Sequence, residues 1–335
     1  MKPSEILHKK ILIAPLNWGL GHASRCIPLI DQLLAQNNSV TIAGSGLSLK
    51  LLQKEYPQLS YKELNDYGIK YHAVFPLWLS MILQIPKIIF AIQKERNLLN
   101  KILEKEHYDL VISDNRYGLH HKNTVCILIT HQLNIIAGIF EGLVNSINHI
   151  LIKKFNFCWI PDNENEFKRL AGRLSQKPDK LNNIYYIGPL SRFKKEENNQ
   201  IKYDVCFMLS GPEPQRSEFE KLIVKWCKKQ EKKICIIRGT DIPMKTTLKN
   251  NVTAFHLAEP KLVNQLFNSS NIIVCRSGYS TIMDLHQLYK KAVFIPTPGQ
   301  TEQEYLACLM EKLGKGKYLL QKDIAGKLSK MLDEV

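Results

Sequence analysis

The stretch between Arg276 and Thr281 combines a cation with small and hydroxyl-bearing residues, which suits the binding of a phosphate. It follows a short apolar run, Asn271–Cys275, that predicts a buried strand. Thr281 and Asp284 have the spacing of a capping box for the next helix. Open α/β sheets hold ligands at the carboxyl ends of their strands, where helices present free N–H groups. We therefore expect a phosphate-bearing ligand here.

A second polar loop follows the next predicted strand, Lys291–Pro296. It contains Gln300, Glu302 and Gln303, whose side chains could bind hydroxyl groups. The two loops together predict a ligand that carries both phosphate and hydroxyl groups.

The stretch Val274–Ala307 resembles the donor-sugar signature of the GT-B glycosyltransferases. It is closest to the family-28 group, which includes the lipid-II-forming N-acetylglucosaminyltransferase, and is also similar to UDP-glucuronosyltransferases. The resemblance implies that the Arg/Ser-Gly loop touches a diphosphate, a carboxylate one turn later binds ribose, and the Gln-rich loop contacts the sugar. The donor-site residues implied are Arg276, Ser277, Gly278, Ser280, Thr281, Asp284, Gln300, Glu302 and Gln303. The ribose acid is usually Glu and is Asp284 here, and the family's Asn after the last Gln is Leu306.

The same resemblance adds donor-site residues elsewhere in the second half of the chain. Ser210 and Gly211 follow the predicted strand Asp204–Leu209, and His256 ends the predicted strand Val252–His256. Arg192 closes Ile187–Arg192, which resembles the family's Gly-x-Pro-x-Arg connection between domains.

The amino-terminal part has its own glycine-rich loop, Asn17–Ser24, between a predicted strand, Lys10–Leu16, and a predicted helix, Arg25–Gln36. With the next strand, Ser39–Ala43, they form a βαβ unit. A dinucleotide-binding fingerprint would need a third Gly at Ser24 and an acid after the second strand, and neither is present. This argues against a nicotinamide-dependent oxidoreductase. Gly19-Leu20-Gly21-His22 instead resembles the Gly-rich loop ending in His of the family-28 enzymes.

His22 and Asp114 are the candidate catalytic residues. Asp114 follows the predicted strand Leu110–Ser113, so it should share the ligand edge of the sheet with His22. An imidazole with a pKa near 6.5 suits general-base work, and a carboxylate can orient it. Glucuronosyl and plant members of the superfamily use such a pair. Alternatively, His22 only caps its helix or binds phosphate.

Further candidates lie on the same edge. The expected acceptor-binding residues are Gly19, Gly21, Arg116 and His131, and His131 is also the reserve base. Asp162 and Glu164 have a spacing that could hold a divalent metal, but solvated loop acids are the preferred interpretation.

A chain of 335 residues predicts two domains of ordinary size. We expect an α/β protein with two doubly wound, Rossmann-like parallel-sheet domains facing a cleft, the GT-B arrangement. Residues 1–187 would bind the acceptor and residues 188–335 the nucleotide sugar. In GT-B proteins the last helix, here predicted at Lys322–Leu332, often crosses back to the first domain.

The charge and composition of the chain indicate which classes of binding partner to expect and where in the cell the protein acts. The chain has 46 Lys and Arg against 31 acids, a net charge of +15, yet no zinc-ligand spacing or RNA-binding aromatic pattern, so no nucleic acid is expected. Eight Cys without regular spacing and a polar amino terminus indicate a cytoplasmic protein with reduced thiols. The apolar segment Ala73–Ile92 is either a core helix or a surface helix that docks on an anionic membrane.

These observations predict an inverting, metal-independent hexosyltransferase that moves a sugar from a UDP-type donor to a glycan, lipid or other hydroxyl acceptor. It would act in cell-envelope polysaccharide synthesis, in the cytoplasm and peripherally on the inner face of the membrane. No metal or cofactor is expected, because Arg276, Arg192 and helix N-termini would offset the phosphate charge. Two alternatives remain: a GT-B-fold sugar-nucleotide epimerase and a non-catalytic sugar-nucleotide-binding partner subunit.

Overall fold

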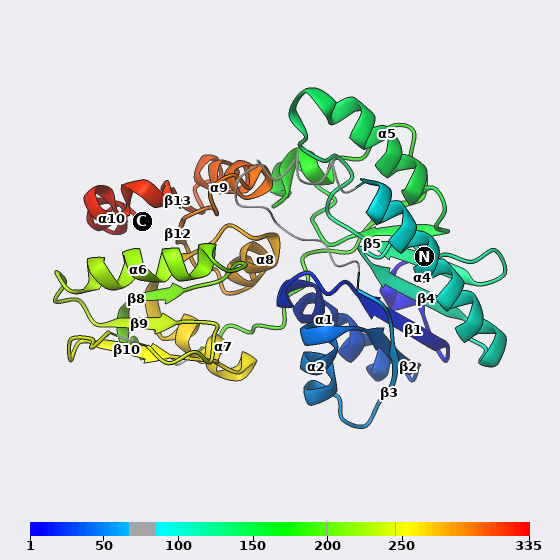
Figure 1. Ribbon diagram of the computed structural model, residues 1–335, viewed down its shortest axis with the longest axis horizontal. Helices are drawn as coiled ribbons and strands as arrows, with labels where there is room; N and C mark the ends of the chain where they lie inside the picture. The colour runs from blue at the N-terminus through cyan, green and yellow to red at the C-terminus, as the bar shows by residue number, and fades with distance from the viewer. Residues whose placement is uncertain (67–84, 198–199, 245) are drawn as a thin grey trace. The chain divides into compact units, whose positions relative to one another are not determined.

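Two β-sheets, each with all of its strands parallel, form the framework of the protein (Figure 1). The computed structural model describes residues 1–66, 85–197, 200–244 and 246–335. The chain separates into two units, Met1–Arg192 and Phe193–Val335, with one sheet in each. The boundary that we expected from the sequence was between residues 187 and 188. Helices flank both sheets, so the predicted class of two doubly wound α/β domains is confirmed.

The first sheet has the strand order β3-β2-β1-β4-β5-β6-β7. Its strands in the described residues are β1 (Lys10–Pro15), β2 (Ser39–Gly44), β3 (Ser60–Glu63), β4 (Leu110–Asp114), β5 (Val125–Ile129), β6 (Phe157–Ile160) and β7 (Ile184–Tyr186). β1 and β4 lie side by side, and Pro15 is opposite Asp114 at their carboxyl ends. The chain order reverses between these two strands, and such a switch point is where open α/β sheets bind ligands.

The helices of the first unit cover both faces of its sheet, which explains why its central strands are continuous apolar runs. Within residues 1–66 and 85–192, these helices are α1 (Leu20–Ala35), α2 (Gly46–Glu55), α4 (Ile85–Lys105) and α5 (Glu141–Ile152). Ile11 and Ile13 of β1 pack on the α1 face, and Leu12 points to the α4 face. Side chains therefore alternate between two cores along each strand, as the pleat requires.

The second sheet has the strand order β10-β9-β8-β11-β12-β13. Its strands are β8 (Tyr203–Met208), β9 (Ile234–Ile237), β10 (Val252–Phe255), β11 (Ser270–Cys275), β12 (Ala292–Phe294) and β13 (Gly316–Tyr318). The helices are α6 (Gln215–Cys227), α7 (Pro260–Asn268), α8 (Tyr279–Gln287), α9 (Thr301–Lys312) and α10 (Ile324–Asp333). Here the switch point lies between β8 and β11, which pair directly.

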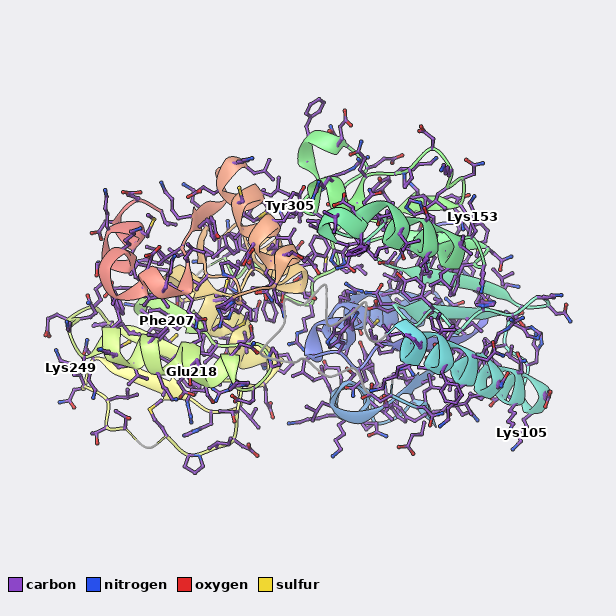
Figure 2. All side chains as sticks on the ribbon, turned by 45° about the horizontal axis from the view of Figure 1, so that its top comes forward. Lys105, Lys153, Phe207, Glu218, Lys249 and Tyr305 are labelled. Carbon is purple, nitrogen blue, oxygen red and sulfur yellow. The ribbon has the colours of Figure 1, made fainter. Side chains whose placement is uncertain are left out.

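The core of the second unit includes α10. Phe207, which is labelled in Figure 2, is fully buried. Its ring meets that of Trp226 of α6 edge-to-face, with 5.6 Å between the ring centroids. Ile324, Leu328 and Leu332 of α10 belong to the same cluster, and Trp226 Nε1 donates to Ser329 Oγ at 3.2 Å. The last helix therefore packs on its own unit.

Three local expectations need correction. Helix α1 begins at Leu20, so Leu20–Ser24, predicted as loop, forms its first turns. Thr281 and Asp284 lie inside α8, whose N-cap is Gly278, so they form no capping box. The sequence analysis also missed several elements, namely β3, β7, α2 and α5. Short strands and a helix that opens on Gly46 carry little periodic signal.

Much of the predicted apolar segment Ala73–Ile92 lies outside the described residues, which resume at Ile85. From there one helix, α4, continues through Gln93 to Lys105. Its Ile89 and Phe90 side chains are exposed, whereas Ile92 is buried. Among the described helices, none is both long enough and apolar enough to cross a membrane.

Helix α4 approaches the loop after β4 so closely that it requires a glycine there. A Cβ on Gly118 would lie 2.4 Å from the Ile92 carbonyl oxygen and 2.7 Å from Glu95 Oε2. Gly118 N–H also donates to Glu95 Oε2 at 2.9 Å. The contact fixes α4 beside the carboxyl end of β4.

We predict that Gly118→Ala lowers stability by about 1–3 kcal/mol, because backbone must move to admit the methyl group. Gly142→Ala in α5 is the matched control, since a Cβ there meets nothing within 4 Å, and a helical Gly→Ala exchange should be neutral or stabilising. Thermal melts of both variants measure the difference. Equal melting temperatures would contradict the close approach of α4.

Candidate functional site

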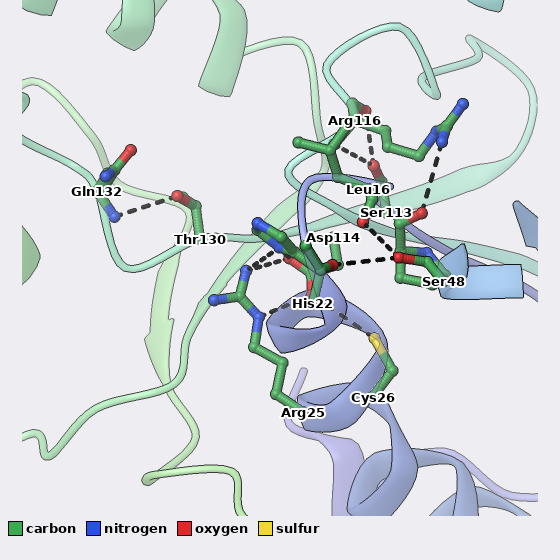
Figure 3. A network of polar contacts seen from close by, with 12 residues as sticks. Leu16, His22, Arg25, Cys26, Ser48, Ser113, Asp114, Arg116, Thr130 and Gln132 are labelled. Carbon is green, nitrogen blue, oxygen red and sulfur yellow. Dashed lines mark hydrogen bonds and ion pairs between the residues drawn. The ribbon is translucent and has the colours of Figure 1, made fainter. Parts of the chain in front are cut away.

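His22 and Asp114 meet at the switch point of the first sheet. Asp114 is the last residue of β4, and His22 lies in the first turn of α1, which follows β1. His22 Nδ1 is 3.1 Å from Asp114 Oδ1 (Figure 3). The predicted pair is therefore in contact, although His22 lies on a helix and not in a loop. Because Nδ1 faces the carboxylate, Nε2 is the ring nitrogen left for a substrate.

Asp114 has further partners that the sequence analysis did not identify. Arg25, one turn after His22 on α1, forms a two-pronged ion pair: Nε donates to Asp114 Oδ2 at 2.7 Å, and Nη2 donates to Oδ1 (Figure 3). The Cys26 thiol lies 3.6 Å from Oδ2. Asp114 is completely buried and Arg25 is 2% exposed. In the spacing Gly-His-x-x-Arg, His22 and Arg25 are three residues apart and lie on one face of the helix. This spacing indicates a site only when the position of Asp114 is also known.

The charged groups of this cluster shift the pKa values of Asp114 and His22. Burial alone would raise the pKa of the Asp114 carboxyl, but Arg25 and His22 outweigh it and hold that pKa well below its usual range. Burial also lowers the pKa of His22 below 6.5; Asp114 opposes this shift, and Arg25 and His131 add to it. At neutral pH the cluster thus contains a carboxylate, a guanidinium and an uncharged imidazole.

The loop between β1 and α1 is held by α2. Ser48 Oγ donates to the carbonyl oxygens of Leu16 and Gly19, both at 3.3 Å, and Ser48 N–H donates to Asn17 Oδ1. Gly19 has φ +78° and is the N-cap of α1, where a Cβ would meet open space. These contacts fix where α1 starts, and therefore where His22 lies.

His131, the reserve base, follows β5 and is 5% exposed. A positive charge on the His131 ring would lower the pKa of His22. Gly21, expected with Gly19 to bind the acceptor, is in the first turn of α1.

Arg116, another expected acceptor residue, has a structural role. It is fully buried, and its Nε donates to Glu95 Oε1 of α4 at 2.6 Å. Its Nη2 donates to the carbonyl oxygen of Asn65 at 2.6 Å. The guanidinium is therefore turned inward, where an acceptor cannot reach it.

Asp162 is likewise structural, and it is not the solvated loop acid that we preferred from the sequence. It is completely buried, and it accepts hydrogen bonds from Leu170 N–H at 2.8 Å, Ala171 N–H at 3.0 Å and Ser175 Oγ at 2.7 Å. Glu164 is exposed. Within the described residues, no three His, Cys, Asp or Glu side chains gather as a set of metal ligands.

In the second unit, the predicted phosphate-binding loops lie at the carboxyl ends of β8 and β11. Ser210 and Gly211 follow β8, and Gly211 has φ +113°. Ser277 follows β11 and is fully buried, with Oγ donating to the Gln303 carbonyl oxygen at 2.7 Å. Gly278 is the N-cap of α8 and offers no side-chain hydrogen bond to the helix. The start of α8 thus has no side-chain cap, and the N-terminus of a helix favours an anion.

Arg276 does not present its charge to a ligand. It is 1% exposed, and Nη1 donates to the carbonyl oxygens of Ile295 at 3.1 Å and Pro296 at 2.9 Å. Nη2 donates to Gln321 Oε1 at 2.7 Å, and the guanidinium stacks 4.1 Å from the centre of the Phe219 ring. Burial lowers the pKa of Arg276 to about 10. The expected phosphate contact of this side chain is therefore replaced by a structural one.

The Gln-rich loop is ordered by its own side chains. Gln303 Oε1 accepts from Thr297 N–H at 2.8 Å, and its Nε2 donates to Gln300 Oε1 at 2.6 Å. Gln303 therefore shapes the loop that was expected to contact the sugar. Leu306, at the position where the family resemblance implies Asn, is fully buried.

The other expected donor residues are placed as follows. Ser280, Thr281, Asp284 and Glu302 are partly exposed on α8 and α9. His256 is exposed just after β10, and its Nδ1 lies 2.6 Å from Arg238 Nη1. Arg238 also pairs with Glu220, which pairs with Arg216, an ionic cluster that the sequence did not reveal. Arg192 is the last residue of the first unit.

Comparison with known proteins supports this description. Residues 216–335 match the model of the glycosyltransferase family 28 C-terminal domain. An uncharacterized glycosyltransferase of Methanosarcina mazei is 24% identical, with 92% of this chain and 85% of that protein covered. A similar protein of Methanosarcina acetivorans is also 24% identical, with the same coverage.

Solved structures show the same fold at low identity. The spinosyn rhamnosyltransferase SpnG, complexed with thymidine diphosphate, has a TM-score of 0.68 at 12% identity, with 97% of this chain and 92% of that chain covered. MurG of Acinetobacter baumannii has a TM-score of 0.56 at 14% identity over the same shares. By its fold and these relatives, the chain is a glycosyltransferase of the GT-B type, with a family-28 match in its carboxyl-terminal part.

Proposed function

We propose that the protein is an inverting glycosyltransferase in which His22 is the general base and Asp114 orients it. The observation that carries the proposal is the 3.1 Å contact between His22 Nδ1 and Asp114 Oδ1 at the switch point of the first sheet. His22 Nε2 would take the proton of the acceptor hydroxyl while that oxygen attacks the anomeric carbon. The bond from this carbon to the diphosphate breaks on the opposite side, which inverts the configuration and releases the nucleoside diphosphate.

The donor is proposed to be a UDP-linked hexose held by the second unit. Its support is the pair of loops at Ser210–Gly211 and Ser277–Gly278, the latter at the uncapped start of α8. With Arg276 turned inward, backbone N–H groups would carry most of the phosphate binding. Arg192 remains the proposed side-chain cation, and no metal is invoked. SpnG is named as a complex with thymidine diphosphate, so uridine and thymidine donors are compared below.

The acceptor is proposed to be a glycan, lipid or other hydroxyl compound bound by the first unit. A role in cell-envelope polysaccharide synthesis at the membrane surface fits the net charge of +15. It also fits the exposed Ile89 and Phe90 on α4, beside the exposed cations Lys87 and Lys94. Interfacial helices combine apolar burial with attraction to anionic lipids.

For the donor site, we predict that Asp284→Ala lowers UDP affinity about tenfold or more, because a hydrogen bond between ribose and a charged group is lost. Thermal-shift titrations with UDP and thymidine diphosphate measure affinity and show which base is preferred. Glu218→Ala is the control, since Glu218 is an exposed residue of α6 that pairs with Lys221. UDP affinity that is unchanged in a folded Asp284→Ala protein removes Asp284 from the site.

For the base, we predict that His22→Ala lowers turnover at least about 100-fold, within the range that a positioned base contributes, while UDP affinity is retained. Turnover is measured as UDP release from UDP-sugars, with and without glycan and lipid acceptors. His107→Ala is the control, because His107 is exposed and pairs with Asp109. Full turnover in His22→Ala would contradict the base role and shift attention to His131. Sugar epimerisation without UDP release would indicate the epimerase instead.

For the membrane, we predict that the protein co-sediments with anionic vesicles and much less with neutral ones. Replacing Ile89 and Phe90 together by Ser should reduce this binding, since both exposed side chains would insert into the interface. Leu257→Ser, at a 65% exposed position in the second unit, is the control. Equal binding to both vesicle types, or binding to neither, would contradict membrane docking.

A further inference from the structure

Arg25 lies where it can control the charge of His22. Its Nε and Nη2 take both oxygens of Asp114, and Nη2 is also 3.0 Å from His22 Nδ1. One guanidinium thus contacts both members of the proposed catalytic pair. Arg25 is 2% exposed and Asp114 is fully buried, so water screens these contacts little.

We propose that Arg25 is a positioning residue that keeps His22 uncharged by occupying the carboxylate that would otherwise stabilise an imidazolium. The inference deepens the proposed function and rests on it, since an uncharged His22 matters for catalysis only if His22 is the base. A protonated imidazole has no free nitrogen with which to accept the proton of an acceptor hydroxyl.

Two effects of Arg25 on His22 have the same sign. The Arg25 guanidinium pairs with both oxygens of Asp114 and offsets the charge of the carboxylate. The carboxylate therefore stabilises a second proton on His22 less strongly. The guanidinium also places positive charge next to Nδ1, which repels a second proton on the ring. The direction agrees with the lowered pKa of His22, to which burial is the largest contribution and Arg25 a further one.

The other groups around His22 do not replace this role. Cys26, on the same helix, is an uncharged thiol because burial raises its pKa well above the usual value. Tyr117, after β4, is an uncharged phenol whose pKa burial also raises. His131, after β5, would lower the pKa of His22 only when it is itself protonated. Among the groups described around His22, Arg25 is thus the one that carries a positive charge at every ordinary pH.

The paired charges also explain how the cluster can be tested without unfolding the protein. Removing one partner of a buried ion pair leaves an isolated charge, whereas removing both together is often tolerated. Arg25→Met with Asp114→Asn replaces the pair by neutral side chains of similar size. Arg25→Lys keeps the cation but loses the two-pronged geometry.

The test is an NMR titration of histidine ring signals in the wild type and in three variants, with His22 assigned by His22→Gln. In Arg25→Met we expect the pKa of His22 to rise by about one unit or more, a tenfold gain in proton affinity. In Arg25→Lys the pKa should remain nearer the wild-type value. The pKa of His22 should also be higher in Arg25→Met/Asp114→Asn than in Asp114→Asn, a fourth variant, because the two differ only in the lowering influence of Arg25.

Two results would overturn the proposal. One is an unchanged or lower pKa of His22 in folded Arg25→Met. The other, which decides the question even if Arg25→Met does not fold, is a pKa of His22 that is no higher in Arg25→Met/Asp114→Asn than in Asp114→Asn, because Arg25 would then have no lowering effect on His22. The pH dependence of UDP release tests the proposed function separately. If the pKa of His22 shifts but the acidic limb of turnover does not, the inference stands and the base role fails.

Discussion

A carboxylate that has lost all contact with water must be paired, and Asp114 is such a carboxylate. Its partner, Arg25, is supplied by α1, and the pair can form only if this helix starts where Gly19 lets it start. His22 is carried to Asp114 by the same helix turn. The start of α1 therefore determines both the pairing of Asp114 with Arg25 and the geometry of the proposed catalytic pair. The hydrogen bonds from Ser48 to Leu16 and Gly19 help to fix this start, because they hold the loop that precedes α1.

Arg276 is held by contacts of a different kind from those of Arg25 and Arg116, although all three side chains are buried. Arg25 and Arg116 in the first unit each meet a carboxylate, on Asp114 and Glu95. Arg276 in the second unit is held by carbonyl oxygens, by Gln321 and by the face of Phe219. Carbonyl groups satisfy the donors of a guanidinium without cancelling its charge. This difference explains why burial lowers the pKa of Arg276 to about 10.

The sequence predicted the sheets better than the side-chain roles. Strands such as Val125–Ile129 are uninterrupted apolar runs, and this pattern is local enough to recognise. The contact of His22 with Asp114 followed from a topological rule about strand ends. The roles of Arg116 and Arg276 could not be predicted, because an arginine near a ligand edge can turn outward or inward. Which way it turns depends on partners distant in sequence, such as Glu95 and Gln321.

The same limit applies to helix starts and to small elements. Gly19-Leu20-Gly21 looks like loop, because glycine is unfavourable within helices, yet tertiary contacts from Ser48 stabilise a helix from Leu20 onward. Thr281 and Asp284 have the spacing of a cap but lie a turn inside α8, since Gly278 already ends the preceding loop. Spacing alone does not tell where the first turn falls.

The inward-facing Arg116 has a consequence for how a local change would spread through the first unit. Its guanidinium joins the carbonyl oxygen of Asn65 to Glu95 of α4, so two segments that are distant in sequence share one anchor beside β4. Loss of this one side chain would leave Glu95 as a buried carboxylate without its arginine and would release the carbonyl oxygen of Asn65 at the same time. The fold thus concentrates the support of two segments in a single residue.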